Sequence, residues 1–284
     1  MGLSTSNKPG IWLRATALGL SLVLAGCITL SRREVEAARM REPEPTKNRV
    51  IVQGPRITAR SLAAVDIVNA RGPVRVVVDP YLTRPTVDAR PIPDVASDQE
   101  EIDRLREVMV VSAESSIDTW RNVLRVRAAY QTSGEKARIE LTIRIPSCGG
   151  VLIRNAEGNV DLIGVTGDIN VHSGVLNQAP GGNITIATEQ QMKGPIKLAT
   201  TSGNIDIVMP GNSSGDYIVS SLDGRVHMQL LAGKVERAII QTSRWTGVIN
   251  GGDHLCQVET MKGNVRIRMA DEPVEFKVES GMAP

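Results

Sequence analysis

The sequence is poor in aromatic residues, with one Phe, three Tyr and three Trp among 284 residues, or 2%. Ligand pockets are usually lined by apolar and aromatic side chains. The chain therefore has few aromatic rings from which a sugar-stacking site could be built. The same shortage predicts a core made of small aliphatic side chains, which suits a thin β-structure.

A surplus of charge is missing as well. Residues 1–26 carry Lys8, Arg14 and no acidic residue, which leaves 31 basic and 31 acidic side chains in the rest of the chain. Proteins that bind nucleic acid by releasing counterions need clustered positive charge. We therefore expect no nucleic-acid partner.

Histidine is equally scarce. His172, His227 and His254 show none of the short spacings with which pairs of histidines bind a metal. The Gly-Gly pairs at 181–182 and 251–252 do not continue into a calcium-binding nonapeptide. The sequence thus predicts no metal site and no catalytic residues.

A hydrophobic run long enough to cross a membrane is also lacking, but the amino terminus has an export layout. The apolar residues 15–24 follow a polar, positively charged start and fall short of the roughly 20 residues of a membrane-spanning helix. Leu24, Ala25, Gly26 and Cys27 then resemble the lipobox of bacterial lipoproteins. The resemblance implies that residues 1–26 are a signal peptide and that Cys27 carries diacylglycerol and acyl chains, with no other cofactor. An ordinary cleaved signal or an uncleaved anchor are the alternatives.

Residues 27–49 follow as a tether, because they mix charges of both signs with Pro43 and Pro45 and hold few apolar side chains. Two or more acyl chains on Cys27 would hold the protein firmly on a membrane. In some diderm bacteria an Asp after the lipidated Cys retains lipoproteins at the inner membrane, and here that position is Ile28. We therefore expect a cell-envelope protein, lipid-anchored in the outer membrane in preference to the inner one.

A short pattern recurs through the remaining chain: Gly, a turn-forming or variable residue, then apolar, polar, apolar. Period-two alternation places the two apolar residues on one face, as in a half-buried β-strand. Glycine and the Asn or Asp that often follows it both tolerate tight turns. The pattern begins at Gly72, Gly158, Gly167, Gly182, Gly194, Gly203, Gly224 and Gly263, and Gly247 matches half of it.

The spacing of this pattern predicts stacked strands. Gly158, Gly182, Gly203 and Gly224 follow one another at 24, 21 and 21 residues, with a second turn within each interval. Units of about 20 residues with two strands each are typical of β-solenoid rungs. We predict an all-β fold, a β-solenoid or β-helix-like stack of short strands punctuated by glycine. An antiparallel meander of the same strands is the alternative.

The run from Ser61 to about Ala270 resembles the bacterial "putative adhesin" domain, a β-solenoid-like family of unknown function. The matching segments are Val65–Val76, Arg138–Pro146 and Thr201–Ile207. The resemblance implies surface adhesion and brings no catalytic residues with it.

An insertion at residues 77–122 departs from that family. It contains Ser97 and Glu100, a capping box, and apolar residues at helical spacing within residues 98–108, which predict one short helix. The domain boundaries follow: residues 50–147 form a mostly β N-terminal region that caps the first rung, and residues 148–284 form the Gly-repeat solenoid. Residues 271–284, with Phe276, are expected to cap the last rung, since exposed strand edges invite aggregation.

Two cysteines and two acids remain as chemical candidates. Cys148 precedes the first predicted repeat and Cys256 lies near the last, so about 20 Å of stacking would separate them, more than a disulfide spans. Unpaired thiols are favoured, and a Cys148–Cys256 disulfide stays open. Asp161 and Asp206 occupy outward positions at which paired carboxylates could cleave a polysaccharide.

These observations favour a membrane-anchored cell-envelope lipoprotein that acts as a non-catalytic structural or interaction module of the adhesin kind. Its expected partners are the membrane, through the lipid, and an envelope or surface protein or glycan. An envelope-stress or signalling accessory protein, or a polysaccharide-active β-solenoid enzyme, are the alternatives. The oligomeric state does not follow from the sequence.

Overall fold

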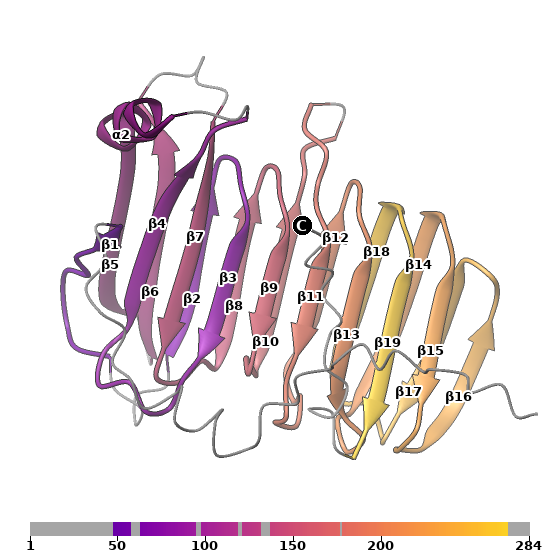
Figure 1. The fold of residues 1–284 in the computed structure, drawn as a ribbon. Helices are drawn as coiled ribbons and strands as arrows, with labels where there is room; N and C mark the ends of the chain where they lie inside the picture. The colour runs from indigo at the N-terminus through magenta and orange to yellow at the C-terminus, as the bar shows by residue number, and fades with distance from the viewer. Residues whose placement is uncertain are drawn as a thin grey trace, which may run out of the picture. The chain divides into compact units, whose positions relative to one another are not determined.

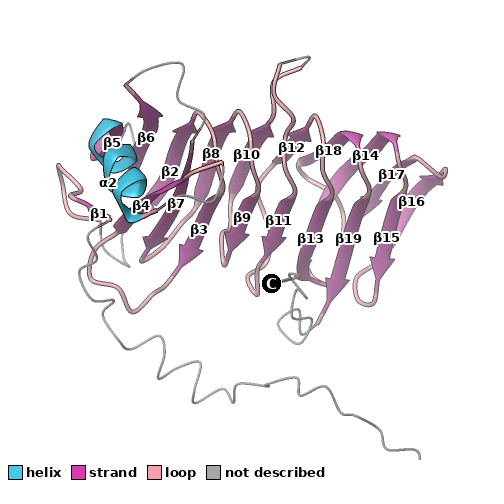
Figure 2. Ribbon diagram, turned by 45° about the horizontal axis from the view of Figure 1, so that its top comes forward, coloured by secondary structure: helices cyan, strands magenta, loops and turns pink. Residues whose placement is uncertain are grey.

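The computed structural model describes residues 48–57, 63–94, 98–118, 121–131, 137–176 and 178–271. These residues form two β-sheets that face each other, with one helix, α2 (Gln99–Val108), at one end (Figures 1 and 2). Sheet A contains, in spatial order, β1 (Arg49–Val50), β4 (Thr86–Ile92), β7 (Arg138–Ile145), β3 (Val74–Val78), β9 (Val160–Ile163), β11 (Ile184–Ala187), β13 (Ile205–Pro210), β19 (Val265–Ala270) and β15 (Val226–Leu230).

Sheet B has ten strands. In spatial order they are β16 (Val235–Ile240), β17 (Arg244–Ile249), β14 (Gly215–Asp223), β18 (Leu255–Lys262), β12 (Ile196–Thr200), β10 (Asp168–Ser173), β8 (Gly150–Asn155), β2 (Ala63–Asn69), β6 (Arg121–Tyr130) and β5 (Met109–Asp118). Within the body of the stack neighbouring strands are parallel, for example β8 beside β10 and β9 beside β11. The predicted β-solenoid-like stack is therefore confirmed, and the antiparallel meander is wrong for the body of the fold.

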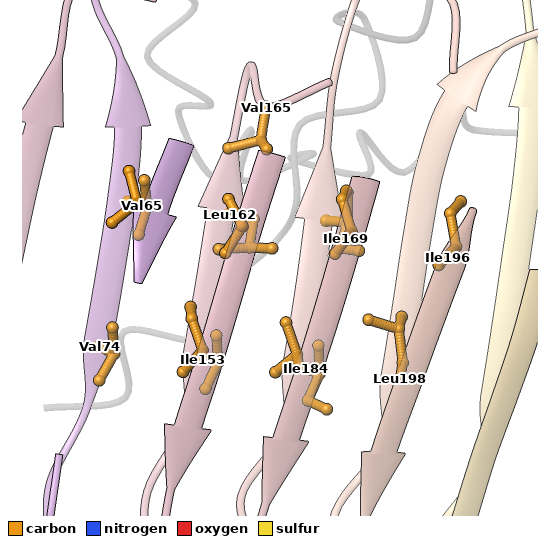
Figure 3. Packing of buried hydrophobic residues seen from close by; sticks show 14 of the residues in the cluster. Val65, Val74, Ile153, Leu162, Val165, Ile169, Ile184, Ile196 and Leu198 are labelled. Carbon is orange, nitrogen blue, oxygen red and sulfur yellow. The ribbon is translucent and has the colours of Figure 1, made fainter. Parts of the chain in front are cut away.

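The repeating unit is a rung made of two consecutive strands, one in each sheet. Seven pairs behave in this way: β2–β3, β6–β7, β8–β9, β10–β11, β12–β13, β14–β15 and β18–β19. Along each strand apolar side chains point inward at every second position, and the inward side chains of both sheets form one continuous core. Figure 3 shows this packing for Val65, Ile153 and Ile169 of sheet B and for Val74, Leu162 and Ile184 of sheet A.

The rungs are not stacked in the order of the sequence. β6–β7 lies outside β2–β3, and β18–β19 is inserted between β12–β13 and β14–β15. Two expectations are corrected by this order. Cys148 does not precede the first rung, because two rungs lie beyond β8, and the last rung in the sequence is not the last in space.

One corner of each rung explains the recurring Gly-Asn pairs. Gly158 has a φ of +112°, and a Cβ added to it would lie 2.5 Å from the carbonyl of Gly72 in the neighbouring rung. Only glycine fits this close approach. The asparagines that follow the corner glycines bond from rung to rung: the side-chain oxygen of Asn159 accepts from the Asn183 N–H at 2.9 Å, and that of Asn183 from the Asn204 N–H at 2.8 Å.

Buried polar side chains complete this corner. In each case a side chain at or near the end of the sheet B strand donates to the carbonyl of a corner glycine, which satisfies that main-chain group. The donors, with their glycine acceptors, are Asn155 with Gly72 and Gly158, Ser173 with Gly158, Thr200 with Gly182, Thr260 with Gly203 and Ser221 with Gly263.

The end of the stack next to β4 and β5 is closed by residues 48–57. This segment pairs with β4 through β1, and the N–H of Gln53 donates to the carbonyl of Ala113 on β5 at 3.0 Å. It therefore bonds to the edges of both sheets. Ile57 is 1% exposed and fills the space between them.

Helix α2 contacts β4 at the same end. The predicted helix is confirmed, but its cap differs from the predicted one: Asp98 is the N-cap, and its carboxylate accepts from the Glu101 N–H at 3.0 Å. Ser97 lies outside the described residues. Leu105 is the fully buried residue of the helix.

The predicted capping role of residues 50–147 is only partly right. β2, β3, β6 and β7 form rungs with the same inward alternation as the later ones, and both sheets contain strands from each side of the predicted boundary between residues 147 and 148. Only residues 48–57, β4, α2 and β5 lie outside the seven rungs at this end. Residues 272–284, including Phe276, lie outside the described residues, and β17 and β16 follow the last rung in sheet B.

Candidate interaction surface

A pocket of about 490 Å³ lies on the outer face of sheet B and crosses β6, β2, β8, β10 and β12 near their amino-terminal ends. It is lined by Ala64, Val65, Asp66, Arg121, Val123, Arg125, Gly150, Val151, Leu152, Asp168, Ile169, Asn170, Pro195 and Lys197. We call it the outer-face pocket.

The register of the strands builds this pocket. Asp66 of β2 lies beside Leu152 of β8, Leu152 beside Asn170 of β10, and Asn170 beside Lys197 of β12. All four occupy outward positions, because the alternate residues of these strands fill the core. Gly150 leaves a hollow in the row before them, where an added Cβ would lie 3.0 Å from the guanidinium of Arg121.

The outer-face pocket has more basic than acidic lining residues. Among the lining residues Arg121, Arg125 and Lys197 are basic, whereas Asp66 and Asp168 are acidic. The carboxylate of Asp66 is already paired with two further arginines, Arg127 at 2.7 Å and Arg154 at 3.4 Å, and is 17% exposed.

The second acidic residue, Asp168, also lies near a basic one. The guanidinium of Arg121 lies 4.0 Å from the carboxylate of Asp168. Lys197 is exposed on the far side of the pocket. The surface that remains for a partner is therefore basic and suits an acidic group.

The outer-face pocket has the chemistry of a binding site. Its lining includes no Ser, Thr, Cys, His or Tyr, and its two carboxylates, those of Asp66 and Asp168, each lie within 4.0 Å of an arginine. Leu152, Val123 and Ala64 supply apolar floor between the charged groups. Side chains of this kind recognise a ligand by charge and shape.

The predicted acids Asp161 and Asp206 lie in one outward row on sheet A. Thr185 of β11 stands between them, so two strand spacings, about 10 Å, separate their main chains. Burial raises the pKa of Asp161, while Arg75 and a hydrogen bond with Thr185 lower it. Arg75 lies beside Asp161, and Arg266 lies beside Asp206.

This row is a ladder of polar side chains across the sheet, in the order Arg75, Asp161, Thr185, Asp206 and Arg266. Inverting glycosidases hold their two carboxyl groups about 6.5–9.5 Å apart across a substrate site. The outer-face pocket described above lies on the other sheet. Each acid here has an arginine on an adjacent strand, an arrangement that stabilises cross-strand pairs. The ladder therefore serves the sheet, and its geometry does not favour hydrolysis.

Residues 211–215 (Gly-Asn-Ser-Ser-Gly) match the Gly-x-Ser-x-Gly pattern of hydrolase nucleophile elbows, which corrects the expectation that the chain lacks this pattern. They join two strands, β13 and β14, whereas the elbow joins a strand to a helix. Ser213 is buried, and its hydroxyl accepts from the Met192 N–H at 3.1 Å. Its role is to satisfy that main-chain group.

Next to this turn, Asp253 contacts both Ser214 and His254, and this arrangement is not that of a catalytic triad. The hydroxyl of Ser214 donates to Asp253 at 3.2 Å, and the Nδ1 of His254 lies 2.7 Å from the same carboxylate oxygen. The contact with His254 lowers the pKa of Asp253. A hydrolase needs the histidine between serine and acid, where it can take the hydroxyl proton.

The three histidines lie apart. His172 is on the outer face of sheet B, His227 is on the outer face of sheet A, and His254 contacts Asp253. Within the described part of the chain no three His, Cys, Asp or Glu side chains come together as metal ligands.

Cys148 and Cys256 are both buried and free, so the disulfide left open by the sequence is not formed. The reason is distance, since β18, which carries Cys256, is three strands away from β8, which follows Cys148. Burial raises the pKa of Cys148 to about 11 and that of Cys256 to about 12. Thiols of this kind stay protonated near neutral pH and are poor nucleophiles.

The predicted lipid site lies outside the described residues. Leu24, Ala25, Gly26 and Cys27 all fall within residues 1–47, so lipid attachment stays a prediction. Among the residues that are described, no helix has the length and apolar character to cross a membrane.

Part of the stack is similar to a known domain family. Residues 139–268, from β7 to β19, match the family described as Toastrack DUF4097, a β-solenoid-like domain. None of the curated proteins matches the chain.

Two solved structures are similar. One, named "putative cell adhesion protein" from Clostridium sporogenes, is 9% identical with a TM-score of 0.42, and the match covers 76% of this chain and 97% of that one. The other, named "putative adhesin" from Bacteroides fragilis, is 10% identical with a TM-score of 0.23, and the match covers 79% of this chain and 99% of that one.

Proposed function

We propose that this protein is a cell-envelope lipoprotein whose β-stack acts as a non-catalytic interaction module. The observation that carries the proposal is the outer-face pocket. Five strands from distant parts of the sequence line it, and four of them, β2, β6, β10 and β12, supply charged side chains.

The partner we propose is an envelope or surface protein or glycan that carries acidic groups. Arg121 and Lys197 stand on opposite sides of the pocket, and Leu152 lies on its floor. Carboxylates bind guanidinium and ammonium groups through charge-assisted hydrogen bonds. A partner with acidic groups on an apolar framework would satisfy both features.

The anchor is proposed from the sequence. Lipid on Cys27 would hold the chain on a membrane, and residues 27–49 would give the stack some reach from it. Ile28 favours the outer membrane. Anchoring matters for binding, because a module confined to a surface meets other envelope components at a raised effective concentration.

The anchor is tested by feeding cells a fatty-acid probe and fractionating their membranes. The wild-type chain should take up label and sediment with membranes, and Cys27→Ala should lose both. Cys148→Ala is the matched control and should keep both. A chain that is exported without label would show that it is a diffusible protein and would refute the anchor.

The pocket is tested by placing a photo-crosslinking residue at Leu152, on its floor, in living cells. We expect an adduct with a discrete envelope component that disappears when Lys197→Glu is added. His227, outward on the other sheet, is the control position and should give no such adduct. Equal adducts from both positions, or adducts that survive Lys197→Glu, would refute the pocket as the contact surface.

A further inference from the structure

Positive and negative side chains alternate across the outer-face pocket. Arg125 lies on β6 and Asp66 on β2. On the other side of the pocket, Asp168 lies on β10 and Lys197 on β12. β8 runs between these two pairs, because the spatial order is β6, β2, β8, β10 and β12. Residues 150–152, the part of β8 that lines the pocket, carry no charge, so the alternation leaves one place to be filled over β8.

The side chain of Arg121 fills this place. Its main chain belongs to β6, but a Cβ added at Gly150 of β8 would lie 3.0 Å from its guanidinium. The same Cβ would lie 3.7 Å from Ala64 of β2, whose short side chain leaves room for Arg121 to cross that strand. Positive groups therefore lie over every second strand, about 10 Å apart, and a carboxylate lies between each two.

The charges over β8, β10 and β12 are open to a partner. Arg121 and Asp168 lie 4.0 Å apart with side chains 41% and 61% exposed, and ion pairs in contact with solvent are weak. Lys197 is exposed, and its neighbours in the same outward row are two uncharged amides, Asn170 and Gln257. A partner's acidic group can therefore bind either basic side chain without first breaking a buried ion pair.

A uniformly acidic partner fits this pattern poorly. For each acidic group that it places on a basic side chain, the next would lie against the carboxylate of Asp66 or Asp168, and like charges repel. A partner whose acidic units alternate with neutral, hydroxyl-bearing units fits better, because a hydroxyl can donate a hydrogen bond to a carboxylate. The amide of Asn170, between Leu152 and Lys197, can both donate to and accept from such units.

The pocket lacks the features by which proteins usually bind peptides. Each of its five strands has a neighbour on both sides, so an extended peptide finds no open edge to which it could add as a strand. Its lining has no aromatic residue for a proline-rich segment, and its apolar residues are interrupted by charges, which does not suit an amphipathic helix. Its volume of about 490 Å³ is typical of pockets that hold small ligands, and it suits a few sugar units.

We propose that the outer-face pocket binds a linear polysaccharide in which acidic and neutral sugars alternate, and that the polysaccharide chain runs across the strands, along the stack. Arg125, Arg121 and Lys197 would each bind an acidic sugar through charge-assisted hydrogen bonds. The carboxylates of Asp66 and Asp168 would accept hydrogen bonds from hydroxyls of the neutral sugars between them. This inference rests on the proposed function, because it names the partner of the same pocket.

Hyaluronan, in which acidic and neutral sugars alternate, is the probe, and its binding to the full chain in detergent micelles is measured by isothermal titration calorimetry. The affinity should rise with oligosaccharide length until all three basic groups are occupied and should then level off. Polyglutamate and the neutral glycan dextran, at matched length, should bind at least about tenfold more weakly. Equal binding of polyglutamate would assign the pocket to an acidic protein and would overturn the proposal. Equal binding of dextran would overturn it too, because charge would then not be what the pocket recognises.

Point variants test whether the oligosaccharide binds in the pocket. Lys197→Gln should weaken hyaluronan binding about tenfold, whereas Lys234→Gln, at an exposed lysine just before β16, should leave it unchanged. Gly150→Val should weaken binding as well, because the new side chain would take the space of the Arg121 guanidinium. Unchanged thermal unfolding, followed by circular dichroism, shows that each variant is folded. Equal losses of affinity in the two lysine variants would overturn the proposal.

The outcomes separate this proposal from the proposed function. If hyaluronan does not bind while the crosslinking residue at Leu152 captures an envelope protein, the polysaccharide is overturned as the partner and the interaction module stands. If hyaluronan does not bind and Leu152 gives no adduct, both proposals are overturned.

Discussion

The two ends of the stack solve the same problem in different ways. At one end, residues 48–57 bond to the edges of both sheets and place Ile57 between them. At the other end, sheet B extends past the last rung through β17 and β16. Within the described residues β15 has β19 as its one strand neighbour, and on its other side the Val226 N–H donates to the carbonyl of Thr242 at 3.0 Å. The first end is thus closed by a segment that precedes the first rung in the sequence, and the second by the turn between β16 and β17 at one position of β15.

This difference shows what a stack of rungs requires. Each internal rung is covered on both sides by others with the same inward side chains, so it needs no special sequence. A terminal rung has one uncovered side. At the end next to β4 and β5 the chain supplies this cover from residues 48–57.

The largest loss of stability is expected from Trp245→Ala, which tests whether the cooperative core extends to β17, near the end of the stack at β15 and β16. Trp245 is 4% exposed, and its ring meets that of Tyr217 edge to face with centroids 6.3 Å apart. Removing it should cost about 4 kcal/mol of unfolding free energy, measured by urea denaturation. Arg244→Ala, its exposed neighbour, should change stability by less than about 0.5 kcal/mol. A loss below about 1 kcal/mol for Trp245→Ala would place the end of the cooperative core before β17.

The closed end should respond to Ile57→Ala with a loss of about 3 kcal/mol. The reason is a cavity between the two sheets where the side chain is now fully enclosed. Ile51, in the same segment, is 82% exposed, and Ile51→Ala should stay within about 0.5 kcal/mol of the wild type. Comparable losses for the two variants would mean that burial of this segment is not what closes the end.

A smaller effect is expected from Ser115→Ala on β5. The buried hydroxyl of Ser115 donates to the carbonyl of Gln53 at 3.1 Å and also contacts that of Pro55, so it ties the closing segment to sheet B. Its loss should cost about 1 kcal/mol and should speed hydrogen exchange at Gln53. Ser112→Ala, at an exposed position of the same strand, is the control. Unchanged exchange at Gln53 would show that the main-chain bonds alone hold the segment.

The smallest effect concerns the two buried thiols, which report on opposite parts of the stack. Because burial raises their pKa values to about 11 and about 12, alkylation of both should be slow at pH 8 and should speed up as the pH rises and thiolate forms. Trp245→Ala, which removes the ring packed against Tyr217 beside Cys256, should accelerate alkylation of Cys256 and leave Cys148 unchanged. Mass spectrometry after labelling measures both, with the urea-unfolded chain as reference. Equal acceleration at the two sites would indicate global rather than local opening.

Local signals in the sequence predicted the repeating parts well. Gly158 and Asn159 mark a corner because a close main-chain approach admits only glycine and because Asn can bond to the next rung. The helix was readable from its apolar spacing, although the cap is Asp98 and not the predicted Ser97. Gly247 fits half the pattern for another reason, since it lies within β17, where an added Cβ would meet the Arg237 carbonyl at 2.4 Å.

The candidate site was not readable in this way. The charged side chains of the outer-face pocket come from segments as far apart as Asp66, Arg125 and Lys197, and their outward positions follow from alternation. Their proximity depends on β6 lying beside β2 and on β12 lying two strands from β8. No local signal marks either neighbour, because all these strands have the same apolar inner face.

The sequence by itself determined which segments are strands, which side of each strand is buried and where each rung turns, because period-two alternation and tight turns are encoded within a few residues. The order of the rungs was decided only in the tertiary structure. Strands with equivalent apolar faces can exchange places at little cost in packing, and the entropy of closing a longer loop grows only slowly with its length. The outer-face pocket and the place of β15 at the edge of sheet A both follow from that order.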